Sequence, residues 1–289
     1  MDQPLGIYYA FLATSDTVDW FDCLRRTKAA GLDVLEMSAP KLRGLSAADR
    51  KGISARAKDL GLTLSLATAL SPDADVSSDD AAIHSAGTRL LMEDVKLAHE
   101  VGALSLGGIL TGVGKAFPEG IEHTRQHAVD NAIRSLREVA KAAEELGVNL
   151  GAEVVNRFES PLVNTCEECL RVAEAVDSPC LGVHLDTFHM NIEEADPAAA
   201  IRLAGKRLIH FHACENNRSL PGHGHIDWNG IFDALHDIRY SGMIVMESLP
   251  GPYGTVSGRL NIWRKLSQDT DGELKQAADF LRALEAARP

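Results

Sequence analysis

A chain of 289 residues with 45% hydrophobic content can bury one large core, which favours a single domain. Its formal net charge of -12 at pH 7 argues against a nucleic-acid partner, because phosphate binding needs a cationic surface. Residues 1–4 show no signal-peptide pattern and no apolar run is long enough to span a bilayer, so we expect a cytoplasmic protein without membrane contact.

A pattern of helix, glycine and strand recurs along the chain. An amphipathic segment ends on a glycine, and a short β-branched or leucine-rich run follows at once. Glycine in the left-handed conformation ends a helix, and such runs are typical of strands buried on both faces. The pattern therefore predicts repeated βα units. It occurs at residues 30–36, 60–66, 101–106, 146–153, 204–210 and 241–247.

Two more strands are predicted near residues 6–9 and 181–186, which brings the number to eight. Eight strands alternating with helices predict an α/β fold, the (β/α)8 TIM barrel. An open doubly wound sheet is the alternative, but no Gly-x-Gly-x-x-Gly follows an early strand. The helices are expected at about 17–30, 46–60, 79–100, 120–146, 165–176, 197–204, 228–239 and 271–287.

Helix starts and loops complete this interpretation. Ser46 and Ser77 are predicted to begin capping boxes, and Asp196 to cap a helix with proline at its first position. No linker or second domain is found, so one barrel domain is expected over residues 1–289. The Gly- and Pro-rich segment at about 248–270 is predicted to be a long last βα loop with its own short helix.

Several chemically distinctive residues have a structural interpretation. Cys166 and Cys169 have the spacing of a zinc or redox pair, but no second pair completes such a site. The five cysteines are an odd, scattered set, and we expect no disulfide. Core packing is expected for Trp20, Trp228 and Trp263, and a solvated loop position for His223 and His225.

Acidic and imidazole side chains stand at the ends of four consecutive predicted strands. Glu153 ends the fifth strand, Asp186 the sixth and Glu247 the eighth, while His210 and His212 lie on the seventh. Side chains at the carboxyl ends of barrel strands gather at one face. A single such residue is more often a cap or part of an ion pair, but three buried carboxylates would repel one another without a cation. Carboxylate and imidazole ligands suit manganese, magnesium, cobalt or iron, with His212 nearer the mouth and His210 deeper.

Several segments resemble the D-tagatose and D-allulose (D-psicose) 3-epimerases. Residues 151–159, Gly-Ala-Glu-Val-Val-Asn-Arg-Phe-Glu, and residues 184–194, His-Leu-Asp-Thr-Phe-His-Met-Asn-Ile-Glu-Glu, look like signature segments of this family. The similarity covers essentially the whole chain. It implies a xylose-isomerase-like barrel, a homodimer or homotetramer, and one divalent metal ion per subunit, with Mn²⁺ favoured over Co²⁺ or Mg²⁺. It continues in order through Gly6-Ile-Tyr-Tyr9, His210-Phe-His212, Asn217-Arg218, Ile244-Val-Met-Glu247 and Ile262-Trp-Arg264.

The resemblance also implies residue roles. Glu153 and Glu247 would act as alternating base and acid at C3 of the ketose. Three of the implied substrate contacts lie a few residues beyond strand ends, and two others lie on or near the first and fourth predicted strands. The implied metal ligands are Glu153, Asp186, His212 and Glu247, and the implied substrate contacts are Glu159, His189, Arg218, Tyr8 and Gly108.

The implied reaction is metal-assisted removal and return of the C3 proton of a free ketose through an enediolate. It would interconvert D-tagatose with D-sorbose and D-fructose with D-allulose, and it extends to ketopentoses. The chain departs from the family at residues 9–12, at residues 107–112 and at Cys214, which stands where a glycine is usual. These positions would line the pocket around the far end of the sugar.

Three other functions compete with this one. An aldose-ketose isomerase of the same superfamily, such as a hydroxypyruvate isomerase, would use the same metal and a similar enediolate. A metal-dependent endonuclease of the related barrel type would need several zinc ions, more histidine ligands and a basic groove, which the charge of -12 opposes. A non-catalytic sugar-binding barrel would not need paired carboxylates.

Overall fold

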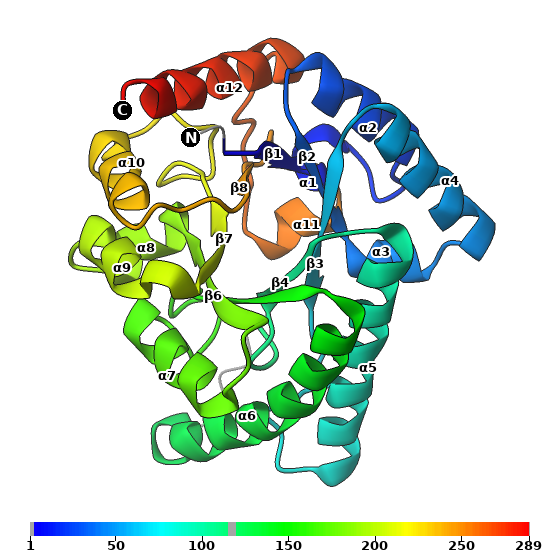
Figure 1. The fold of residues 1–289 in the computed structure, drawn as a ribbon, viewed down its shortest axis with the longest axis vertical. Helices are drawn as coiled ribbons and strands as arrows, with labels where there is room; N and C mark the ends of the chain where they lie inside the picture. Colours follow the sequence, from blue (N-terminus) through cyan, green and yellow to red (C-terminus); the bar gives the residue numbers. More distant parts are fainter. Residues whose placement is uncertain (1–2, 115–119, 289) are drawn as a thin grey trace.

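Eight parallel strands pair in chain order, and the last pairs with the first to close a barrel (Figure 1). The structure is a computed structural model that describes residues 3–114 and 120–288, so residues 1–2, 115–119 and 289 of the predicted 1–289 domain lie outside the described residues. The predicted (β/α)8 fold is confirmed. The strands are β1 (Leu5–Tyr8), β2 (Val34–Ser38), β3 (Thr63–Ala69), β4 (Ser105–Ile109), β5 (Asn149–Glu153), β6 (Leu181–Asp186), β7 (Leu208–His212) and β8 (Ile244–Met246).

The longer helices surround the strands on the outside of the barrel (Figure 1). Each corresponds to a predicted helix, and their ends differ from the prediction by at most three residues. They are α2 (Trp20–Ala29), α4 (Ala47–Asp59), α5 (Ala81–Val101), α6 (Ile121–Leu146), α7 (Cys166–Val176), α9 (Pro197–Ala204), α10 (Trp228–Asp237) and α12 (Thr270–Ala286).

Several short helices lie in the connections between the strands and the long helices. The helix predicted within residues 248–270 is α11 (Gly254–Arg259). Four others were not predicted, because one or two turns are too short to show an amphipathic period. They are α1 (Tyr9–Leu12), α3 (Ala39–Arg43), α8 (Thr187–Glu193) and the 3₁₀ helix η1 (Gly205–Arg207).

Local capping chemistry explains most helix ends. Ser46 accepts a hydrogen bond from the backbone N–H of Asp49, and Asp196 caps α9, as predicted. The prediction that Ser77 begins α5 is wrong. Asp80 is the cap, because its carboxylate accepts the backbone N–H groups of both Ala82 and Ile83.

The side chains assigned to the core or to loops are mostly where they were expected. Trp20 and Trp228 are buried, and His223 and His225 are exposed. Trp263 is a correction, because 72% of its side chain is exposed. Its segment follows α11 without forming a helix, so no buried helix face is available to it. None of the described helices is long and apolar enough to cross a membrane.

Candidate metal centre and active site

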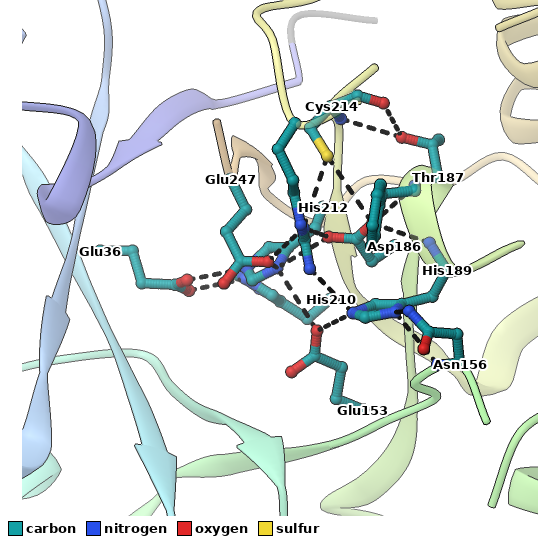
Figure 2. Close-up of polar contacts among 12 residues, drawn as sticks. Glu36, Glu153, Asn156, Asp186, Thr187, His189, His210, His212, Cys214 and Glu247 are labelled. Atoms are coloured by element: carbon teal, nitrogen blue, oxygen red, sulfur yellow. Dashed lines mark hydrogen bonds and ion pairs between the residues drawn. The ribbon is translucent and has the colours of Figure 1, made fainter. Parts of the chain in front are cut away.

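Four strand ends deliver the predicted metal ligands to the same end of the barrel. Glu153, Asp186 and His212 are the last residues of β5, β6 and β7, and Glu247 directly follows β8. The register pairs Asp186 with His212 on neighbouring strands. One ligand atom from each of the four residues lies within 4.8 Å of the others, and all four side chains point toward one another (Figure 2).

The imidazole of His212 faces three carboxylates. Its Nδ1 atom lies 3.6 Å from Asp186 Oδ2, 3.5 Å from Glu247 Oε2 and 3.8 Å from Glu153 Oε1. This nitrogen is buried and makes no hydrogen bond. The separations are too long for good hydrogen bonds but suit donor atoms that share one cation. A buried ring nitrogen surrounded by carboxylate oxygens fits a divalent metal ion.

The opposite nitrogen of His212 contacts Glu36, a site residue that the sequence did not predict. Glu36 Oε1 lies 2.7 Å from His212 Nε2, Oε2 lies 2.8 Å from His210 Nε2, and Ser65 Oγ donates to Oε2 over 2.9 Å. Burial opposes ionisation of Glu36, but the two histidines hold its pKa well below the usual value. The available signal was a glutamate within the apolar run 34–37, since an unpartnered buried carboxylate is costly.

Three imidazoles fill the barrel interior beside this carboxylate. The rings of His184, His210 and His212 pack edge to face, with centroids 4.1–5.0 Å apart. Room for them comes from glycines on neighbouring strands: a Cβ atom at Gly107 would lie 3.1 Å from His184 Nδ1, and one at Gly151 would lie 3.3 Å from His210 Cβ. His210 is therefore deeper than the four predicted ligands, as expected.

Arg218 brings a positive charge to the carboxylates. Its Nη1 atom donates to Asp186 Oδ2 over 2.8 Å and to Glu247 Oε2 over 2.6 Å. The guanidinium lies 4.2 Å from the centroid of the Phe188 ring, which fixes its plane. Burial opposes ionisation of Asp186, but Arg218 and His212 lower its pKa well below the usual value.

His189 is a neutral hydrogen-bonding group beside Arg218. Its Nδ1 accepts the backbone N–H of Asn156 over 3.0 Å. Its Nε2 atom lies 2.9 Å from Arg218 Nη2, which can only donate, and 3.7 Å from Glu153 Oε1. Burial and the guanidinium lower the pKa of His189 to about 3.

Two predicted substrate contacts lie on strands of the barrel. Tyr8 ends β1 and is half-buried, and burial, then Tyr9 and Glu247, raise its pKa well above the usual value. It therefore lies near the carboxylates. Gly108 lies in β4 with a φ of 115°, where an added Cβ would lie 2.1 Å from the backbone oxygen of Thr68. Contact of either residue with a substrate remains a prediction.

Acidic groups determine the electrostatics at the mouth. Burial raises the pKa of Glu153 well above the usual value, and the nearby charge of Glu247 raises it further. Burial opposes the charge of Arg218, but Asp186 and Glu247, with a smaller effect of Glu159, raise its pKa. Glu159 is half-buried in the loop after β5 and acts on the same guanidinium as the predicted metal ligands.

Comparison with known proteins connects this geometry with a family. A sequence profile described as xylose isomerase-like TIM barrel matches residues 24–284. The chain is 36% identical to the D-psicose 3-epimerase of Enterocloster bolteae, over 96% of this chain and 94% of the relative. It is 35% identical to the L-ribulose 3-epimerase of Mesorhizobium japonicum, over 98% and 95% of the two chains.

The fold is also similar to solved structures of ketose 3-epimerases. The crystal structure of D-psicose 3-epimerase with D-tagatose from Clostridium cellulolyticum H10 superposes with a TM-score of 0.93 at 34% identity. The match covers 98% of this chain and 99% of that one. A structure of L-ribulose 3-epimerase gives a TM-score of 0.90 at 32% identity, covering 99% of this chain and 95% of that one. The whole barrel is shared, including the strand ends that carry the site.

Proposed function

Because this chain belongs to the xylose isomerase-like TIM barrel family and, within it, to the ketose 3-epimerases, we propose that it inverts C3 of free ketoses. One observation carries the proposal: Glu153, Asp186 and Glu247 converge on the buried, unbonded Nδ1 of His212. The proposed substrates are D-fructose and D-allulose, D-tagatose and D-sorbose, and ketopentoses such as L-ribulose. Relatives named for psicose and for L-ribulose support both sugar lengths.

The four predicted ligands, Glu153, Asp186, His212 and Glu247, would hold one divalent metal ion. Three hard carboxylate donors with one borderline imidazole favour Mn²⁺, with Co²⁺ or Mg²⁺ as alternatives. When bound, the ion would supply Lewis acidity that stabilises negative charge on the ketose oxygens. Three of the four side chains are buried and Glu247 is half-buried, which limits access of bulk water and strengthens such charge interactions.

The two glutamates perform the proton transfers. In one direction the Glu153 carboxylate accepts the proton from C3 and becomes a carboxylic acid, while Glu247 in its protonated form returns a proton to the opposite face of C3. In the reverse direction they exchange roles. Their places on β5 and after β8 let them approach a substrate from different sides of the barrel mouth.

Neighbouring side chains bind and orient the sugar. Arg218 can donate to the oxygen on which negative charge develops, and His189 lies beside its guanidinium, where it can contact a ketose oxygen. Glu159 is proposed to accept a hydroxyl hydrogen bond. Tyr8 and Gly108 are proposed to line the pocket at the ends of β1 and β4.

The assembly is proposed to be a cytoplasmic homodimer or homotetramer. Two large aromatic side chains support subunit contact: Phe158, in the loop after β5, is 66% exposed, and Trp263, in the loop after β8, is 72% exposed. Exposed aromatic residues are enriched at protein interfaces.

Isotope exchange tests the function directly. Protein loaded with Mn²⁺ is incubated with D-fructose, D-tagatose, D-allulose or L-ribulose in deuterated water, and the products are identified by chromatography and proton NMR. We expect deuterium at C3 and a C3-inverted ketose, both lost when a chelator is added. Label at C1 or C2 with an aldose product would instead indicate an aldose-ketose isomerase, and no exchange with any free sugar would contradict the proposal.

A further inference from the structure

We infer that Glu36 is a positioning residue that fixes the proton and the orientation of His212 and thereby sets the affinity of the metal centre. The inference rests on the proposed function, because it concerns the proposed metal ligand. Glu36 lies within β2 rather than at a strand end, and its side chain is completely buried. It touches neither the proposed substrate contacts nor the three carboxylate ligands through any hydrogen bond described for it.

The contact between Glu36 and His212 crosses the barrel. In the closed strand order, β1 and β8 lie between β2 and β7. The Glu36 side chain therefore reaches through the barrel interior to His212. Figure 2 shows its carboxylate oxygens in contact with the histidine rings. A carboxylate placed in the barrel core has no solvent to stabilise it, so its protein partners determine its charge and position.

The hydrogen-bond chemistry fixes the tautomer of His212. An ionised carboxylate only accepts hydrogen bonds, so the 2.7 Å contact requires the proton on Nε2 of His212. A neutral ring then carries its lone pair on Nδ1, the atom that faces Glu153, Asp186 and Glu247. A carboxylate behind a ligating histidine orients the ring and makes it a better donor to the metal.

Both oxygens of Glu36 are engaged, so the carboxylate itself cannot turn. Oε1 is taken by His212, and Oε2 accepts from Ser65 Oγ over 2.9 Å and lies 2.8 Å from His210 Nε2. Glutamine in this place would offer one acceptor oxygen and one NH₂ donor. If its NH₂ group turned toward His212 it would favour the wrong tautomer of that ring, and in the other orientation its neutral oxygen would be a weaker acceptor for Nε2–H.

The test measures metal affinity rather than turnover. The dissociation constant for Mn²⁺ is measured by electron paramagnetic resonance of the free ion, on wild type and on Glu36→Gln. We expect binding about 10 to 100-fold weaker in the variant. Ser65→Ala removes one hydrogen bond to Glu36 and should weaken binding by only a few-fold.

Asp94→Asn is the matched control. Asp94 is also completely buried, and it is bonded to Thr68 and Arg43 on the outer side of the barrel wall, away from the metal ligands. This variant makes the same change from carboxylate to amide in the interior. It should lose stability but keep the wild-type dissociation constant for Mn²⁺.

A second readout needs no metal. In chelated, ¹⁵N-histidine-labelled protein, the ring nitrogen and N–H proton shifts of His212 report the hydrogen bond that its Nε2–H group makes. We expect a protonated Nε2 whose proton signal is shifted downfield by its charged acceptor Glu36 in wild type, and loss of that shift in Glu36→Gln, a change that a merely space-filling role for Glu36 would not produce.

Each outcome decides the inference. A folded Glu36→Gln protein with the wild-type affinity and the wild-type Nε2–H signal would overturn the role of Glu36 alone. Failure of wild type to bind any divalent ion would overturn the proposed metal centre and the role of Glu36 together. If Glu36→Gln does not fold, the Ser65→Ala affinity decides, and an unchanged value would contradict the inference.

Discussion

Glu153 and Glu247 are proposed to transfer protons at C3 of the ketose, which an amide side chain cannot do. Changing either to Gln preserves shape but removes the group that accepts or returns a proton. We expect kcat to fall by roughly 10²–10⁴-fold or more in each variant. Turnover and deuterium incorporation at C3 would be measured at saturating Mn²⁺. Asp94→Asn is the control for loss of a buried carboxylate elsewhere. Near-normal turnover in either glutamine variant would eliminate the scheme with two glutamates.

His189 gives the metal-free protein a defined sensitivity to acid. Its pKa is lowered to about 3 in the fold, whereas an unfolded histidine titrates near 6.5. Between these values the unfolded chain binds more protons, so the contribution of His189 to stability is lost as pH falls below 6.5. The slope is about 1.4 kcal/mol per pH unit.

Urea unfolding in the presence of a chelator measures this effect. Between pH 7 and pH 5.5, wild type should lose about 1 kcal/mol more of its unfolding free energy than His189→Gln, which has no imidazole to titrate there. Parallel losses in the two proteins would mean that His189 is not held neutral by Asn156 and Arg218.

At the scale of the elements, strands and long helices were predictable because their sequence periods are local. The glycines at the ends of α5 and α6, Gly102 and Gly147, have φ values of 74° and 69°, as the helix-glycine-strand pattern requires. The strand-end rule of barrel enzymes then located four side chains that do converge. Short helices such as α8 gave no periodic signal.

The remaining part of the site depends on how the barrel closes. Glu36 meets His212 across the interior, and no spacing along the chain reveals which inward-facing residues of β2 and β7 will touch. Trp263 was assigned to the core because it was expected on a helix, but the helix of this loop ends at Arg259 and Trp263 lies in an irregular segment. Both differences arise from tertiary geometry rather than from local sequence preference.

Strand β4 contains a position that only glycine can occupy. Gly108 has a φ of 115°, and an added Cβ would lie 2.1 Å from the Thr68 backbone oxygen, which belongs to the neighbouring strand. Gly108→Ala must therefore move backbone, and we expect a loss of about 2–4 kcal/mol in unfolding free energy. Gly258→Ala is the control, since no atom lies within 4 Å of its added Cβ. Equal stability of the two variants by urea unfolding would contradict this account.

For the whole molecule, metal binding should couple the ends of four strands. Without a cation, three carboxylates lie close together at the carboxyl ends of the strands. The guanidinium of Arg218 pairs with two of them, Asp186 and Glu247. A ligand that binds only the folded state stabilises it by about 2.7 kcal/mol at a concentration 100 times its dissociation constant. Mn²⁺ should therefore raise Tm by several degrees, and a chelator should reverse the rise.

Asp186→Asn provides the comparison for this thermal experiment. It removes a charged ligand from β6 and should abolish most of the Mn²⁺-dependent rise in Tm, whereas Asp94→Asn should lower Tm but keep the rise. A metal response that persists in Asp186→Asn would place the binding site elsewhere.

Subunit association is predicted to involve the exposed surface around Trp263, which takes no part in closing the barrel. Trp263 is 72% exposed, and a tryptophan buried at an interface commonly contributes about 2 kcal/mol or more to binding, a factor of roughly 30 in the dissociation constant. Sedimentation velocity should find wild type as a multiple of the 31.1 kDa chain. Trp263→Ser should shift it toward the monomer, whereas Phe21→Ser, which removes a 52% exposed aromatic from the outer helix α2, should leave assembly unchanged. A monomeric wild type would contradict the proposed oligomer, and an unaffected Trp263→Ser assembly would place the interface on another face.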